Sequence, residues 1–102
     1  MTRRDALVSV IEALHAEIAA LKTSDVAALE KATSAKIAGL DAVATFGDEP
    51  ASADIRELAR EAHRLNETCR IYVNLMAANV RRRLQILSGA AAGYGPVGAA
   101  YA

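Results

Sequence analysis

The feature that most constrains this chain is a regular repeat of apolar residues in its second half. From Ile55 to Met76 these residues alternate at three- and four-residue spacings, and further apolar positions follow after a four-residue step. The positions are Ile55, Leu58, Ala62, Leu65, Cys69, Tyr72, Met76, Val80, Leu84 and Leu87. Because an α-helix has about 3.6 residues per turn, this spacing predicts a helix from Ser52 to about Ser88 with one apolar stripe along it.

The first half carries a similar stripe. Its apolar positions are Leu7, Ile11, Leu14, Ile18 and Leu21, and the residues expected on the opposite, solvent-facing side are Arg4, Glu12, Glu17 and Lys22. After the polar residues 23–25 the stripe resumes at Val26, Leu29, Ile37, Leu40 and Val43. Either a turn separates two short helices here, or one long helix bends. A reversal without Gly or Pro is uncommon, so the sequence favours one bent helix from about residue 3 to about 46, weakened at Gly39 by about 1 kcal/mol.

The clearest break in the sequence is Phe46-Gly47-Asp48-Glu49-Pro50. Gly can end a helix and Pro50 suits the first turn of the next one, so we expect the chain to reverse here. The predicted fold class is therefore all-α: an antiparallel hairpin of two long helices, with the first helix bent or broken near residues 22–25, so that three helices are possible. Residues 1–88 are expected to form this domain and residues 89–102 a flexible Gly/Ala-rich tail.

Composition excludes several classes of protein. The chain has 102 residues, enough for one domain, and a single cysteine, which excludes a disulfide framework and suits the cytoplasm. Twelve basic and twelve acidic residues cancel, so no net field attracts nucleic acid or anionic lipid. No apolar run is long enough for a membrane span, and we expect no stable membrane insertion.

The sequence offers no catalytic constellation. His15 and His63 stand on separate predicted helices, most simply as solvated residues, and Cys69 continues the apolar stripe as a small core residue. We expect no enzyme activity, no cofactor and no metal. The run Arg81-Arg82-Arg83 points in three directions around a helix and lacks interleaved aromatic residues, so it favours a role at the negative end of the helix over nucleic-acid binding.

The most informative segment runs from Ile71 to Val80, where apolar side chains occupy nearly the full circumference of the predicted helix. A two-helix hairpin buries one seam, so Val73, Leu75, Ala77 and Val80 stay exposed unless another helix docks. A bend of the first helix or a homodimer could cover them. The alternative is a site for a client helix, in which Met76 gives an adaptable surface. The predicted client-binding residues are Val73, Met76, Ala77, Val80, Leu84 and Leu87.

Several segments together resemble a known family. They are the amphipathic first helix, Asp25-Val-Ala-Ala-Leu29 leading to Lys36 and Leu40, Leu65-Asn66-Glu67, the run from Val73 to Val80, and Tyr94-Gly95-Pro96-Val97-Gly98. In this arrangement the chain resembles the FlgN family of flagellar type III export chaperones over nearly its whole length.

The resemblance implies a non-enzymatic cytoplasmic chaperone for bacterial flagellum biogenesis. Such a protein would bind the C-terminal amphipathic helices of the hook-filament junction proteins FlgK and FlgL, prevent their premature association and deliver them to the export gate component FlhA. It further implies that Tyr94 takes part in docking to the gate. The alternative that the residues leave open is a self-associating coiled-coil structural or adaptor protein that uses the same apolar faces for a homodimer.

Overall fold

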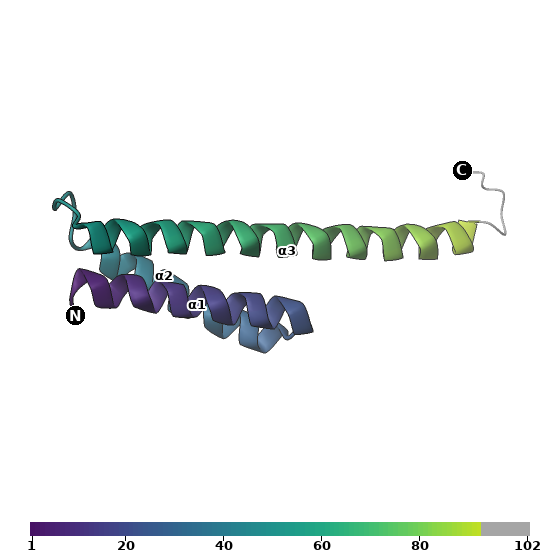
Figure 1. Cartoon of the computed structure of the whole chain (residues 1–102). Helices are drawn as coiled ribbons and strands as arrows, with labels where there is room; N and C mark the ends of the chain where they lie inside the picture. The colour runs from purple at the N-terminus through teal and green to yellow at the C-terminus, as the bar shows by residue number, and fades with distance from the viewer. Residues whose placement is uncertain (93–102) are drawn as a thin grey trace. The chain divides into compact units, whose positions relative to one another are not determined.

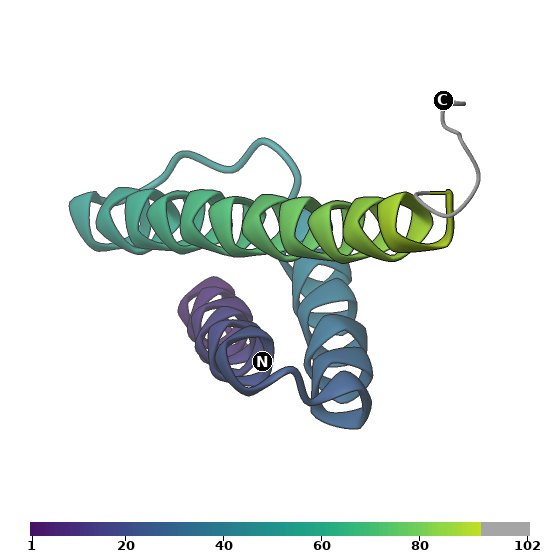
Figure 2. The same cartoon turned by 90° about the vertical axis from the view of Figure 1, so that its right-hand side faces the viewer.

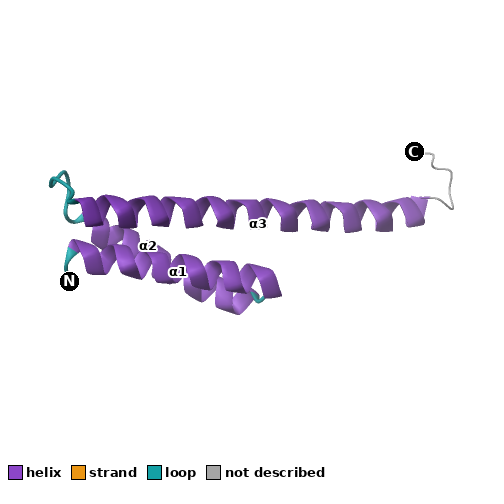
Figure 3. Cartoon of the chain, viewed as in Figure 1, coloured by secondary structure: helices purple, strands orange, loops and turns teal. Residues whose placement is uncertain are grey.

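Three helices make up the part of the chain that the computed structural model describes, which is the backbone of residues 1–92 and the side chains of residues 1–89. They are α1 (Arg3–Thr23), α2 (Val26–Ala44) and α3 (Ala53–Ala92), and no strand occurs in this range (Figures 1 and 3). The all-α prediction is confirmed, in its three-helix form. The chain divides into two units, Met1–Tyr72 and the part from Val73 onward, so the boundary falls inside α3.

Helix α1 begins with a reciprocal cap. The Thr2 hydroxyl accepts a hydrogen bond from the Asp5 backbone N–H, and the Asp5 carboxylate accepts one from the Thr2 backbone N–H. Hydrogen bonding from Thr2 to the carboxylate, chiefly from the Thr2 backbone N–H, lowers the pKa of Asp5. The two hydrogen bonds of the cap satisfy donors that a helix start leaves unpaired. The apolar stripe predicted for this helix is confirmed, because its members are all buried or half-buried: Leu7, Ile11, Leu14, Ile18 and Leu21.

The prediction of one continuous first helix is wrong, because the chain reverses at Ser24. Ser24 adopts a left-handed conformation with φ of 55°, the role that Gly usually takes, and its backbone N–H donates to the carbonyls of α1. Asp25 then caps α2 by accepting a hydrogen bond from the Ala28 N–H at 3.0 Å. As a result α1 and α2 lie side by side and antiparallel (Figures 1 and 2).

Helix α2 packs on α1 through its small residues rather than its large ones. Ala32 and Gly39 are its buried positions. The expectation that the large apolar residues of α2 extend the buried stripe is wrong for three of them, which are exposed: Val26, Ile37 and Leu40. Gly39 has a specific reason to be Gly, because a Cβ there would lie 2.8 Å from Cγ2 of Val10. The glycine that weakens α2 as an isolated helix therefore permits the close approach of α1.

The connection to α3 turns at Gly47, whose φ is 59°. The prediction that Pro50 stands in the first turn of the next helix is wrong, because α3 begins at Ala53, and the Ser52 hydroxyl accepts a hydrogen bond from the Ile55 N–H. The start of α1 is tied to this region, since Arg3 donates to the Glu49 carbonyl at 2.8 Å. At its other end α3 continues to Ala92, past the predicted end at Ser88.

Candidate functional site

Two halves of α3 provide the candidate sites. We call Ala53–Tyr72 the N-terminal half and Val73–Ala92 the C-terminal half, following the boundary between the two units. In the N-terminal half the residues of the predicted apolar stripe are buried or half-buried, as the heptad spacing predicts, and we call them the N-terminal stripe: Ile55, Leu58, Ala62, Leu65, Cys69 and Tyr72.

A buried polar cluster joins all three helices at the N-terminal half. Glu17 of α1 is a buried residue, 5% exposed. Its carboxylate accepts a hydrogen bond from the Thr33 hydroxyl of α2 at 2.8 Å and forms an ion pair with Lys36 Nζ at 3.1 Å. The Sγ of Cys69 on α3 lies 3.7 Å from the same carboxylate. Glu17 is thus a charged group that the fold compensates with partners from two other segments of the chain.

The prediction that Glu17 faces solvent is wrong, and the sequence contained a signal for this. Glu17 follows Leu14 by three residues and precedes Leu21 by four, which is the spacing of the buried stripe itself. Its charge argued for an exposed position, but a charge can be buried where a cation and a hydroxyl reach it. Lys36 and Thr33 supply these groups.

The cluster holds Cys69 as a protonated thiol. Burial raises the pKa of Cys69, and the neighbouring Glu17 carboxylate raises it further, while Lys36 acts in the opposite direction. A thiol with a raised pKa is a poor nucleophile, in agreement with the prediction that Cys69 is a core residue. His15 and His63 are exposed, as predicted. Within residues 1–92 no group of three or more His, Cys, Asp or Glu residues is placed to hold a metal ion.

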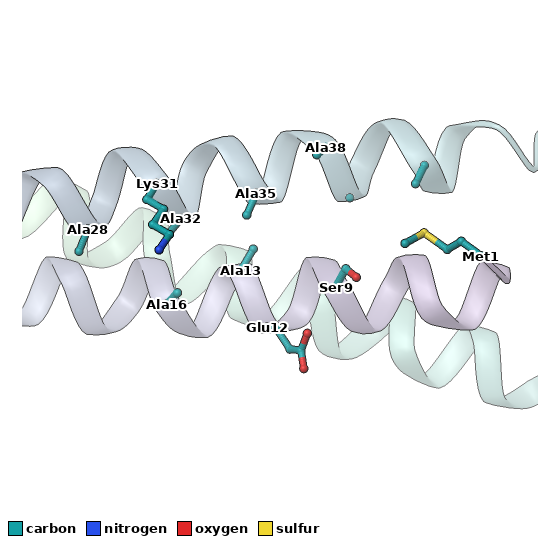
Figure 4. A pocket seen from close by; sticks show the side chains of 12 residues that line it. Met1, Ser9, Glu12, Ala13, Ala16, Ala28, Lys31, Ala32, Ala35 and Ala38 are labelled. Carbon is teal, nitrogen blue, oxygen red and sulfur yellow. The ribbon is translucent and has the colours of Figure 1, made fainter.

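A groove of about 640 Å³ runs between α1 and α2 (Figure 4). It is lined mainly by alanines from both helices, including Ala13, Ala16, Ala28 and Ala35, and the Met1 side chain lies at one end. Its charged lining residues, Glu12 and Lys31, are both exposed. The alanines account for the groove, because short side chains leave space beside the contact that Gly39 makes with Val10.

The C-terminal half presents the other candidate site. Its predicted client-binding residues are all exposed except Met76, which is half-buried; we call these six the C-terminal stripe: Val73, Met76, Ala77, Val80, Leu84 and Leu87. Val80, Leu84 and Leu87 are 52%, 57% and 66% exposed, against 5% for Leu65 in the N-terminal half. Beyond Met76 every side chain described is exposed. The prediction that this segment stays uncovered is therefore confirmed for Val73, Leu75, Ala77 and Val80.

The two stripes do not continue one another in a single heptad register. The strict repeat of the N-terminal stripe would place Asn79 and Arg83 after Met76, whereas the apolar residues stand at Val80 and Leu84. One four-residue step in place of a three-residue step rotates the apolar line around the helix. A second group of exposed apolar residues lies on another side of the helix: Ile71, Leu75 and Ile86.

Comparison with known proteins adds no relative: no protein family, no curated protein and no solved structure matches this chain. Over the described residues, none of the helices has both the length and the apolar character needed to cross a bilayer. Tyr94, the residue assigned to gate docking by resemblance, lies outside the described residues.

Proposed function

We propose that the chain is a helix-binding export chaperone whose client lies along the C-terminal stripe. The observation that supports this most strongly is the row of large apolar side chains left exposed on one side of a regular helix, with Val80, Leu84 and Leu87 all more than half exposed. An amphipathic partner helix meets such a row at the same i, i+3, i+4 spacing.

The energetic reason is the apolar area that a partner would cover. Fully burying one Leu, Val or Met side chain is favourable by about 1.5–3 kcal/mol, so several together can offset the cost of ordering a flexible client segment. Met76 and Ala77 add a polarizable and a small side chain, which suit a surface that accepts more than one client sequence.

The identity of the client rests on the resemblance to the FlgN family. On that basis the clients are the C-terminal amphipathic helices of FlgK and FlgL, and delivery is to the export gate component FlhA. The residues shared with the family pattern include the run from Val73 to Val80, which holds four of the six residues of the C-terminal stripe.

The first test is titration of the full chain with a labelled FlgK or FlgL C-terminal peptide, followed by fluorescence anisotropy. Val80→Asp should abolish binding, because the new carboxylate would be desolvated against the client at a cost of several kcal/mol. The variant must keep the wild-type helical circular dichroism spectrum. Wild-type affinity in a folded Val80→Asp protein contradicts the proposed site.

A matched pair of variants gives the sharper control. Leu75 and Leu84 are both leucines of α3 and both 57% exposed, but only Leu84 belongs to the C-terminal stripe. Leu84→Asp should weaken peptide binding strongly, and Leu75→Asp should leave it within about threefold, because rim changes cost little. Equal losses in the two variants contradict a client confined to the C-terminal stripe.

Delivery is tested separately from binding. Tyr94→Ala should leave the melting temperature and peptide binding unchanged, while reducing the contact with FlhA and the export of the client. A large loss of stability would mean that the ring packs within the fold, and unchanged export would end the docking role of Tyr94.

Self-association through the same exposed side chains is the competing function. Sedimentation equilibrium with and without the FlgK peptide separates the two. A monomer that forms a one-to-one complex supports the chaperone, and a dimer indifferent to the peptide supports a structural or adaptor protein.

A further inference from the structure

The charges of the C-terminal half are all of one sign. Glu67 is the last acidic residue in the sequence, and Arg81, Arg82 and Arg83 follow without a carboxylate near them along the helix. Arg70, by contrast, forms an ion pair with Glu67 at 2.8 Å. Among the residues that the structure describes, no carboxylate forms an ion pair with any of the three consecutive arginines, and all three are exposed.

Their positions around the helix distinguish the three arginines. Counting about 100° per residue from Val80, Arg81 lies about 100° to one side and Arg83 about 60° to the other. Arg82 lies about 160° away, on the opposite side of the helix. The C-terminal stripe is thus bordered by a guanidinium on each edge, while the third arginine points away from it.

We propose that the partner of the C-terminal stripe is an amphipathic helix with acidic residues on both borders of its own apolar stripe. This inference rests on the proposed function and adds the charge of the client to it. Two paired helices bring the residues that border their seam within ion-pair distance, so Arg81 and Arg83 select carboxylates at those positions and disfavour lysines.

The same charges argue against a second copy of this chain as the occupant. A dimer formed by pairing two C-terminal halves would bring two arginine triplets together, and the residues from Thr68 to the end of the sequence contain no Asp or Glu to compensate them. Like charges facing each other at a seam are unfavourable by about as much as opposite charges are favourable. A partner with acidic borders removes this penalty.

The distribution of apolar and charged residues around the C-terminal half also differs from that of a helix lying on an anionic membrane. Such a helix needs one apolar and one polar side. Here the side opposite the C-terminal stripe carries Ile71, Leu75 and Ile86, which are 54%, 57% and 63% exposed, beside Arg82. Apolar residues on both sides suit contact with protein better than a flat lipid surface.

The test uses three labelled synthetic helices with one apolar stripe at the 3,4,4,3 spacing of Val73, Met76, Val80, Leu84 and Leu87. They differ only in their border residues, which are all Glu, all Gln or all Lys. Each is titrated with the full wild-type chain at 50 mM and 500 mM NaCl. We expect the Glu helix to bind about tenfold more tightly than the Lys helix at low salt, with the Gln helix between them, and the difference to shrink at high salt.

Variants assign the selectivity to particular arginines. In Arg81→Gln/Arg83→Gln the preference for the Glu helix should fall to less than about twofold, whereas the control Arg82→Gln should retain it. Retained preference in the double variant, or an equal loss in Arg82→Gln, overturns the inference.

Equal binding of the three helices, with loss in Val80→Asp, overturns the charge selection and leaves the proposed binding site standing. Binding of none of them overturns both. Tighter binding to phosphatidylserine vesicles than to the Glu helix, or a dimer that excludes the Glu helix in sedimentation, overturns the inference in favour of a lipid surface or a second copy.

Discussion

The N-terminal and C-terminal halves of α3 have similar apolar side chains at similar spacing but different surroundings. Leu65 is 5% exposed in the N-terminal half and Leu84 is 57% exposed in the C-terminal half. The residues of the N-terminal stripe are all buried or half-buried, whereas those of the C-terminal stripe are exposed apart from the half-buried Met76. Periodicity therefore establishes that a stripe exists, and only the neighbouring elements determine whether the chain itself buries it.

The two halves also differ in whether their charged side chains have partners. The N-terminal half pairs its own charges at i, i+3: Glu57 with Arg60, Glu61 with Arg64, and Glu67 with Arg70. The hydrogen bond from Arg70 lowers the pKa of Glu67. The C-terminal half has cations alone. A helix that compensates its charges internally needs no charged partner, whereas one that does not leaves its arginines available to a partner.

The largest effect is expected on the free energy of unfolding when a leucine of the N-terminal half is replaced by Ala. The same substitution in the C-terminal half serves as the comparison. Leu65→Ala should lower the free energy of unfolding by about 2–4 kcal/mol, because it removes buried methyl groups and leaves a cavity. Leu84→Ala should change it by less than about 0.5 kcal/mol, because that side chain is exposed. Urea unfolding followed by circular dichroism measures both. Equal losses would mean that Leu84 is packed in the folded protein.

The next largest effect on the free energy of unfolding is expected from the ion pair between Glu17 and Lys36, which belongs to the cluster that joins the three helices. Lys36→Met should lower the free energy of unfolding by about 1–3 kcal/mol, since it leaves the Glu17 carboxylate buried without a cation. The partial exposure of Lys36, at 22% of its side chain, keeps the loss below that of a fully buried pair.

Two further variants act as controls for the ion pair. Lys31→Met, at an exposed position of the same helix, should have little effect. Glu17→Gln added to Lys36→Met should recover part of the loss, because it removes the unpaired charge and keeps an acceptor for the Thr33 hydroxyl. A Lys36→Met protein as stable as the wild type would show that water compensates Glu17.

A smaller effect is expected at the contact between α1 and α2. Gly39→Ala adds helix propensity, favourable by about 1 kcal/mol, but its Cβ meets the stiff, β-branched Val10 side chain. Overpacking costs about 1–3 kcal/mol, so the net change should be a destabilisation of about 1 kcal/mol. Val10→Ala should be less harmful in the Gly39→Ala background than alone. A melting temperature above that of the wild type would mean that the helices separate easily.

Cys69 should have the smallest effect on stability. Its folded-state pKa is raised above the ordinary value of 9.0, so the unfolded chain loses its thiol proton first as pH rises. The contribution of this group is fully present below pH 9.0 and is lost as pH rises through the raised pKa, giving a small fall in stability that Cys69→Ala should lack.

Thiol labelling compares the accessibility of the two halves of α3. Native Cys69 should react with iodoacetamide only on unfolding, whereas Cys69→Ala/Leu84→Cys should be labelled at once and protected by a bound client peptide. Fast labelling of native Cys69 would show that the N-terminal half opens readily.

Local sequence signals predicted much of the fold. The spacing from Ile55 to Tyr72 predicts α3 and its buried side, and Gly47 marks the turn before it. The sequence left a turn near residues 22–25 open but did not favour it, because a left-handed Ser is uncommon and the segment has neither Gly nor Pro. The burial of Glu17 was missed for a related reason, since Thr33 and Lys36 lie beyond that turn and reach the carboxylate only when α2 folds back.

For the candidate site, too, the sequence predicted one part and the tertiary structure decided the other. The sequence by itself determined that α3 carries apolar side chains along Val73–Leu87 and that Arg81 and Arg83 border them, because helical periodicity is a local property of the backbone. Only the tertiary structure decided where along α3 the buried part of the apolar stripe ends, with Leu65 5% exposed and Leu84 57% exposed. Burial depends on which other segment lies against a side chain, and here that depended on a reversal at Ser24 that brings α2 back along α1.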